Sequence, residues 1–211
     1  GGAPEDEGTS APAVRKQLHA SLARLQTGYV DVYYLHRPDA PELLDDTLLE
    51  LARCLRDGAI RCYGVSNYSA LQLRALLDAA RALGVPPPAA CQPPLSLLKT
   101  GALDELIPLC AAEGISVMPY QVYEGGLLTG KYRRGAPPPK GSRRDEMPAW
   151  LAAPDGAAFD RLEALEADAA RMGLDLAGYA LRWALGRPAV ASAVVGAKNA
   201  GQLDAAVAAT A

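Results

Sequence analysis

Short apolar runs alternate with longer amphipathic segments along most of the chain, and this alternation restricts its fold more than any other feature. The run YVDVYYLH, residues 29–36, follows a segment whose apolar side chains recur at every third or fourth position, and IRCYGVSN, residues 60–67, follows a second such segment. Apolar runs of this kind are typical of strands buried on both faces, and the segments between them are typical of helices. The alternation predicts a parallel sheet covered by helices.

The predicted elements follow one another in regular order. We expect helices at 14–26, 43–58, 69–84 and 103–114, and later at 157–172, 176–185 and from Gly201 onward. We expect strands at 29–36, 60–67, 89–97, 115–120 and 190–196. Gly28 and Gly58 are the expected ends of the first two helices, and Ser69 is the expected N-cap of the third. Residues 1–12, rich in Pro and Gly, are expected to be irregular.

Two folds contain a parallel sheet of this kind. A doubly wound sheet normally carries a glycine-rich phosphate turn after its first strand, and the sequence contains no G-x-G-x-x-G. A (β/α)8 barrel places polar site residues at the carboxyl ends of many strands. Here every predicted strand ends in such residues: His36 and Arg37, Ser66 and Asn67, Gln92, Tyr120 and Gln121, Lys198 and Asn199. The sequence favours the barrel, although it supplies about five strand–helix units and a complete barrel has eight.

Composition restricts the class of function. The chain has 211 residues, with 24 acidic and 21 basic side chains and a formal charge of -3, so it offers no basic field for nucleic acid or anionic lipid. Its four cysteines show no metal-site spacing, and no run of about 18 apolar residues occurs. We expect a single cytoplasmic domain over residues 1–211 that acts on small molecules, and the cysteine spacing suggests no zinc site. The loop at 122–157 exceeds the usual loop length and is expected to be functional.

Several motifs resemble the aldo-keto reductase family, in the family's order. They are SLARLQTGYVDVYYLHRPD, GAIRCYGVSNYS, CQPPLSLL, GGLLTGKY and VVGAKNAGQL. The long loop, with its pair Ser142 and Arg143, is similar to that of the branch containing aflatoxin-aldehyde reductases and potassium-channel β subunits. The resemblance implies a (β/α)8 barrel that uses NADPH to reduce aldehydes and ketones without a metal, of which this chain would be the carboxyl-terminal portion. It also implies that the loop at 122–157 serves the cofactor or substrate.

His36 gains a role through this resemblance. By chemistry alone, a single histidine at a strand end is more often a hydrogen-bonded structural residue than a catalyst. In the family, the histidine of the matching L-H-x-P-D segment lies beside the reacting carbonyl, where a neutral imidazole donates a hydrogen bond to the substrate oxygen. The channel-subunit relatives carry Asn there, so His36 favours a reductase-type pocket. His19, inside the first predicted helix, is expected at the surface.

The resemblance also implies a set of cofactor-binding residues. Ser66, Asn67 and Gln92 match the residues that hold the nicotinamide carboxamide, and Tyr120 matches the aromatic residue that stacks on the nicotinamide ring. Turn chemistry and packing are the alternative explanations for these four. Lys131 and Arg143 are candidates near the phosphates. The candidates for the ribose 2′-phosphate are Lys198, Asn199 and Gln202.

The chain departs from the family's pattern at the phosphate and adenine positions. QVYEGG replaces the usual Ser-Pro-Leu or Asn-Pro-Leu, so Glu124 brings a negative charge toward the phosphates unless Lys131 or Arg143 offsets it. Ala205 and Ala206 occupy the positions where the family usually has Glu-Asn at the adenine. We therefore expect weak NADPH binding or none.

The family's catalytic aspartate, tyrosine and lysine come from the first three strand–helix units, which we do not find in this sequence. Tyrosines occur, but none stands in the catalytic context, so we expect the chain alone to be nearly inactive. Three alternatives stay open: a shortened NADPH-dependent reductase, a non-catalytic binding or regulatory module, and a biosynthetic lyase, isomerase or cyclase with His36 as base. An unpaired strand edge at 29–35 predicts self-association.

Overall fold

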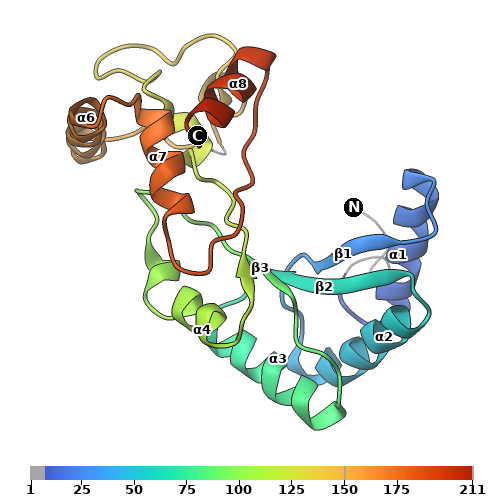
Figure 1. Ribbon diagram of the computed structural model, residues 1–211. Helices are drawn as coiled ribbons and strands as arrows, with labels where there is room; N and C mark the ends of the chain where they lie inside the picture. The colour runs from blue at the N-terminus through green and yellow to red at the C-terminus, as the bar shows by residue number, and fades with distance from the viewer. Residues whose placement is uncertain (1–7, 150, 211) are drawn as a thin grey trace. The chain divides into compact units, whose positions relative to one another are not determined.

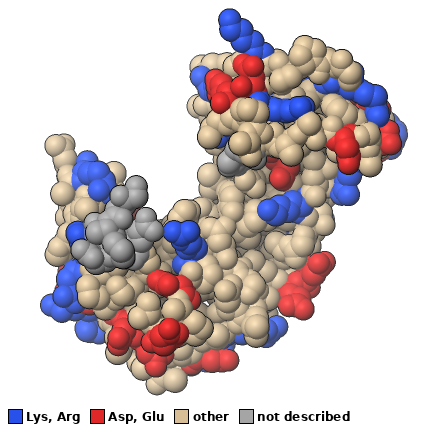
Figure 2. Space-filling model, turned by 180° about the vertical axis from the view of Figure 1, so that it is seen from behind, with Lys and Arg blue, Asp and Glu red and all other residues tan. Residues whose placement is uncertain are grey.

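The computed structural model describes residues 8–149 and 151–210, and the chain divides into two compact units (Figure 1). The first unit comprises Gly1–Pro93 and Leu103–Val117, and the second comprises Pro94–Ala102 and Met118–Ala211. Both signs of charge occur on the face of each unit visible in Figure 2. Within the described residues, no helix is both long enough and apolar enough to cross a bilayer. All four cysteines are free thiols.

The first unit contains a parallel four-stranded sheet, as the alternation predicts. Its strands lie in chain order and are β1 (Val30–Leu35), β2 (Ile60–Ser66), β3 (Ala90–Gln92) and β4 (Ser116–Val117). The helices before and between them are α1 (Ala11–Leu25), α2 (Leu44–Arg56), α3 (Ala70–Leu83) and α4 (Leu106–Ala112), with short 3-10 turns at Pro41–Leu43 and Gly101–Leu103. In Figure 1, α2, α3 and α4 lie along one side of this sheet.

The two faces of the sheet carry different side chains. Tyr33 points toward the helices, where its hydroxyl donates to the Val14 carbonyl at 3.4 Å. Tyr34, the next residue, lies on the opposite face beside its register partner Gly64. A Cβ at Gly64 would lie 2.5 Å from Cε1 of Tyr34 and 3.0 Å from the Ala90 carbonyl oxygen. The absence of a side chain at Gly64 therefore makes room for the Tyr34 ring.

Helices α1 and α2 are joined by a charged pair. The Arg15 guanidinium donates two hydrogen bonds to the Glu50 carboxylate, at 2.8 and 2.5 Å, and the Glu50 side chain is only 6% exposed. Hydrogen bonding to Arg15 holds the pKa of Glu50 below its usual value, although burial opposes this shift. The pair thus ties α1 to α2, which packs on β2.

The second unit is mainly helical. Its elements are a 3-10 segment η4 (Glu124–Thr129), α5 (Arg143–Glu146), α6 (Gly156–Arg171), α7 (Leu176–Leu185) and α8 (Ala200–Ala208). One part of its core contains Leu97, Leu128, Leu162, Leu176 and Ala180. The segment after η4 is held on α6 by ion pairs of Arg133 with Glu166 at 2.6 Å and of Arg134 with Asp160 at 2.6 Å. The long loop expected at 122–157 thus includes two short helical segments, η4 and α5.

The predicted strands are longer than those observed, and proline explains two of the differences. β3 ends at Gln92 because Pro93 and Pro94 follow it, and a proline has no N–H for the ladder. β4 ends before Pro119. The predicted strand at 190–196 is wrong: the described sheet has four strands, and in this segment Val194 donates a single backbone bond to Pro119, at 2.8 Å.

Helix ends differ less from the expectations. The first helix ends before Gln26, which adopts a left-handed φ of 53°, so the prediction of Gly28 as its end is wrong. The same helix begins at Ala11 because Ser10 caps it and Pro12 fits its first turn, so the expected irregular stretch reaches only to Ser10; residues 1–7 lie outside the described part. Ser69 is confirmed as an N-cap, and it forms a capping box with Gln72.

Candidate functional site

Four of the predicted site residues of the first unit lie at the carboxyl edge of its sheet. His36 follows β1, Ser66 ends β2 with Asn67 directly after it, and Gln92 ends β3. The Asn67 side chain donates to the His36 carbonyl at 2.7 Å, and the Ser66 hydroxyl donates to the Gln92 carbonyl at 2.8 Å. The structure thus brings these residues together, with Ser66 buried and His36 exposed.

Asn67 is the centre of this arrangement. Its backbone has a φ of 63°, a left-handed conformation that Asn tolerates better than most residues. Its Nδ2 also lies 3.2 Å from the Ser66 hydroxyl oxygen, and its backbone N–H donates to the Gln92 carbonyl at 3.4 Å. A single residue therefore ties the ends of three neighbouring strands.

Four tyrosines of the first unit have a shifted pKa, and in all four the pKa is raised. Burial raises the pKa of Tyr33, Tyr34, Tyr63 and Tyr68, in the case of Tyr68 to about 12. A tyrosine that acts as a proton donor near neutral pH needs its pKa shifted the other way. These phenols therefore stay protonated and are poor general acids.

Tyr120 lies in the second unit, next to the segment that follows Gln92 in the chain. Its carbonyl accepts a hydrogen bond from the Leu95 N–H at 3.1 Å. Burial raises its pKa, and the nearby charge of Glu124 raises it further. The Glu124 carboxylate in turn accepts a bond of 2.8 Å from the hydroxyl of the fully buried Ser96. Glu124 is therefore held to Ser96 within this unit.

Lys131 lies over the turn that contains Glu124. A Cβ added at Gly126, whose φ is 97°, would lie 2.6 Å from the Lys131 ammonium nitrogen. The same ammonium is 5.4 Å from the centre of the Tyr132 ring. The Lys131 charge is thus placed beside the backbone of η4.

Three further predicted residues, Lys198, Asn199 and Gln202, lie at the start of α8. Asn199 is the N-cap and accepts from the Gln202 N–H at 3.0 Å, while the Gln202 side chain accepts from the Lys198 N–H at 2.7 Å. The Lys198 ammonium donates to the Gly141 carbonyl at 2.7 Å and to Glu146 at 2.8 Å. These contacts join the start of α8 to the segment that carries α5.

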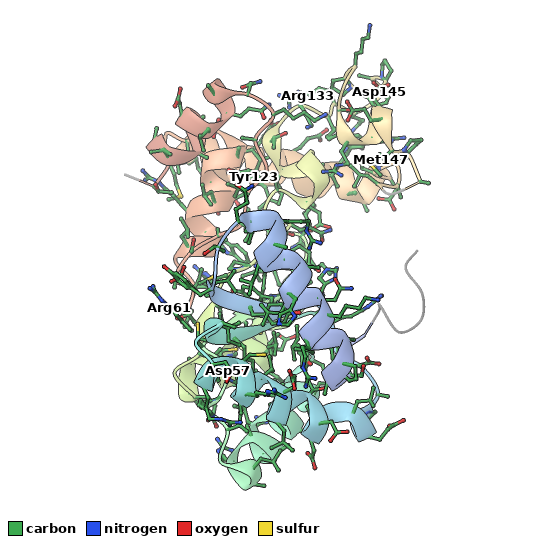
Figure 3. All side chains as sticks on the ribbon, turned by 90° about the vertical axis from the view of Figure 1, so that its right-hand side faces the viewer. Asp57, Arg61, Tyr123, Arg133, Asp145 and Met147 are labelled. Atoms are coloured by element: carbon green, nitrogen blue, oxygen red, sulfur yellow. The ribbon has the colours of Figure 1, made fainter. Side chains whose placement is uncertain are left out.

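Arg143 begins α5, the same short helix that ends at Glu146. Its guanidinium lies 3.7 Å from the sulfur of Met147, which Figure 3 labels together with Asp145. The structure therefore places Arg143 on the segment that contacts Lys198, although the two residues are far apart in the sequence.

Two residues of the site are missing from the sequence-based prediction. Ser96 holds Glu124, and Glu146 holds Lys198. Glu146 is separated from Lys198 by 52 positions, and no spacing rule connects them. An acidic residue close after a predicted basic site residue, as in GSRRDE, was the available signal.

These features define the class of protein: an α/β protein whose parallel strands present polar side chains at their carboxyl edge, as barrel enzymes do. A sequence model of the Aldo/keto reductase family matches residues 2–211, and the chain belongs to this family. The fold of the family is a (β/α)8 barrel, and the four described parallel strands form part of such a barrel. The resemblance seen in the sequence is thereby confirmed.

Curated relatives include channel subunits and reductases. The chain is 30% identical to a probable voltage-gated potassium channel subunit beta of Arabidopsis thaliana, over 97% of this chain and 63% of the relative. It is 33% identical to Protein tas of Escherichia coli, over 94% and 62%. It is also 30% identical to the L-glyceraldehyde 3-phosphate reductase of Escherichia coli, over 95% and 59%.

A solved structure shows the same fold. The glycerol dehydrogenase of Gluconobacter oxydans superposes with a TM-score of 0.79 at 29% identity, covering 94% of this chain and 59% of that protein. The chain therefore spans about three fifths of the length of the relatives it matches.

Proposed function

We propose that this chain carries part of the site of an NADPH-dependent reductase that converts an aldehyde or ketone into an alcohol. The family is one of oxidoreductases, and two of the relatives are named for the reduction of L-glyceraldehyde 3-phosphate and the dehydrogenation of glycerol. The observation that carries the proposal is the Asn67–His36 hydrogen bond of 2.7 Å, which ties the cofactor candidate after β2 to the carbonyl-binding candidate after β1.

The residues present suit a nicotinamide nucleotide in their chemistry. Hydroxyl and amide groups of Ser66, Asn67 and Gln92 can recognise a carboxamide, and the Tyr120 ring offers a face for stacking. The cations and amides that would hold the phosphates and the ribose are Lys131, Arg143, Lys198, Asn199 and Gln202. The cofactor would supply the hydride for reduction of the carbonyl carbon.

His36 would act on the carbonyl oxygen. A neutral imidazole that donates a hydrogen bond there orients the substrate and stabilises the negative charge that develops on the oxygen. Asn67 would position His36 by holding its backbone. Burial raises the pKa of Tyr33, Tyr34, Tyr63 and Tyr68, so we expect no efficient proton donor among these four. Turnover by this chain alone should then be lower by about a hundredfold to ten-thousandfold than with a general acid.

Cofactor binding is the direct test. Titration of the protein into NADPH, followed by nucleotide fluorescence, should reveal binding weaker than that of a typical reductase, because Glu146 pairs with Lys198 and Glu124 adds a negative charge on the turn beside Lys131. Ser66→Ala and Gln92→Ala should weaken it further. Submicromolar binding would contradict the weakness, and no binding at any concentration would overturn the cofactor proposal.

The role of His36 has a matched control. His36→Asn should lower any measured aldehyde reduction by about tenfold or more while leaving NADPH affinity within about twofold. His19→Asn, an equal change on the exposed face of α1, should change neither. Equal effects of the two substitutions would contradict a catalytic role for His36.

A non-catalytic regulatory module is the second candidate. Its support is the similarity to proteins named as potassium channel subunits beta. This candidate predicts nucleotide binding with no turnover of any aldehyde, even when His36 is intact. We also propose a cytoplasmic location and self-association through the edge of β1, which are testable separately.

A further inference from the structure

The Glu146 carboxylate occupies one side of the Lys198 ammonium. The two groups are 2.8 Å apart, and the Gly141 carbonyl accepts a second hydrogen bond from the same ammonium at 2.7 Å. Both Glu146 and Lys198 belong to the second unit, so this contact is internal to one compact body. Lys198 is also the cation at the start of α8 that the proposed function assigns to the ribose 2′-phosphate.

We infer that Glu146 is a specificity-determining residue, which competes with a 2′-phosphate for Lys198 and thereby shifts the nucleotide preference from NADP(H) toward NAD(H). The inference deepens the proposed function and rests on it. Glu146 repels the 2′-phosphate of NADP(H). It does not repel the adenosine ribose of NAD(H), which carries no phosphate.

The charges around Lys198 disfavour a 2′-phosphate without excluding it. A 2′-phosphate brought to Lys198 carries up to two negative charges, and the Glu146 carboxylate would lie within a few ångströms of it, so the repulsion offsets part of the attraction to Lys198. The side chains of Lys198 and Glu146 are 59% and 52% exposed, so their own pairing is weak and a ligand can displace it. The outcome is a lower phosphate affinity rather than a blocked site.

Hydrogen bonding favours the unphosphorylated ribose. A carboxylate only accepts hydrogen bonds, and a ribose 2′-hydroxyl can donate one, whereas an ionised phosphate cannot. Glu146 is thus compatible with the hydroxyl and incompatible with the phosphate at the same position. Asp145, its neighbour on α5, is already engaged by the Gly141 N–H at 2.7 Å and does not contact Lys198 through any described bond.

The test uses two fragments that differ only in the 2′-phosphate. Adenosine 2′,5′-bisphosphate and adenosine 5′-monophosphate are titrated by calorimetry into the full chain and its variants at low salt. Glu146→Gln should raise the affinity for the bisphosphate by about tenfold and leave that for the monophosphate within about twofold. Asp145→Asn, an equal loss of charge one residue away, should have a clearly smaller effect. Raising the salt concentration should reduce the difference.

A double-mutant cycle assigns the effect to the pair. In a Lys198→Gln background the gain from Glu146→Gln should fall to less than about threefold, because the cation that the carboxylate occupies is gone. Equal gains for both fragments, or no gain for the bisphosphate, would overturn the inference while the proposed function stands. Failure of every variant to bind either fragment would overturn the nucleotide-binding proposal itself, and the inference with it.

Discussion

The side-chain amide of Asn67 donates a 2.7 Å hydrogen bond to the backbone carbonyl of His36, and it joins the residue after β2 to the residue after β1. Because Asn67 has a left-handed backbone, Asn67→Gly removes the side chain without adding strain. We expect this substitution to lower the free energy of unfolding by about 1 kcal/mol and to broaden the His36 imidazole signals in NMR spectra. Urea unfolding and those spectra provide the measurement.

The isosteric variant Asn67→Asp sharpens this test. It keeps the shape and the tolerance of a left-handed φ, but it replaces the donor with an acceptor that faces the His36 carbonyl. We expect a larger loss of stability than for Asn67→Gly, and wild-type stability in both variants would contradict the importance of the bond.

Gly64 makes room for Tyr34, and this leads to a second prediction. Gly64→Ala would place a methyl carbon 2.5 Å from the Tyr34 ring and 3.0 Å from the Ala90 carbonyl. We expect a loss of about 1 to 3 kcal/mol in unfolding free energy, because the ring must leave its position and the strand backbone cannot move away. Chemical denaturation followed by circular dichroism measures it.

Two further variants separate the steric cause from a general effect of alanine. Gly28→Ala meets no atom within 4 Å and should change stability by less than about 0.5 kcal/mol. In a Tyr34→Ala background the cost of Gly64→Ala should shrink, since only the Ala90 carbonyl remains to oppose it. Additive losses would show that Tyr34 is not the obstacle.

The sequence predicts the order and type of the elements in the first unit well, because apolar runs and amphipathic segments report burial directly. It overestimates strand length where a proline follows the strand: Pro93 and Pro119 shorten β3 and β4. It also fails at 190–196, where an apolar composition suits a strand, but Val194 bonds to Pro119 and Val190 to Arg187, and the segment does not join the described four-stranded sheet.

The candidate site shows the same division. His36, Ser66, Asn67 and Gln92 follow predicted strands, so the parallel topology alone brings them to one edge. No comparable rule predicts from the sequence which residues of two loops will contact each other. Neither the Ser96–Glu124 bond nor the Lys198–Glu146 pair follows from periodicity, because loop conformation decides them.

The Arg15–Glu50 pair predicts how stability depends on pH. Because the pKa of Glu50 is lowered in the folded chain, its contribution to stability is fully present above its unfolded pKa, near 4.5, and is lost as the pH falls through the folded pKa. Glu50→Gln should therefore cost about 1 to 2 kcal/mol at neutral pH and progressively less below about pH 4.5. Urea unfolding of both proteins across this range measures the difference. A pH-independent difference would contradict the assignment.

The edge of β1 predicts self-association. In the described sheet β1 pairs only with β2, so its other edge presents unpaired backbone groups. Asp31 is the one charged residue of this strand, and Arg61 on β2 neutralises it at 2.6 Å, while the Arg61 guanidinium also stacks on Tyr29 at 4.5 Å (Figure 3 labels Arg61). The charge that could protect the edge is therefore already paired.

We expect the chain, expressed alone, to be insoluble or to form oligomers through residues 29–35. Val32→Lys places an unpaired charge in the middle of the edge strand and should shift the protein toward monomer in size-exclusion chromatography with light scattering. Leu71→Lys is the matched control, because Leu71 is 77% exposed on α3, away from the edge, and the same change there should leave the oligomers intact. Equal effects of the two lysines would indicate general solubilisation. A stable, monodisperse wild-type monomer with a cooperative melt would show that the edge of β1 does not recruit a second chain.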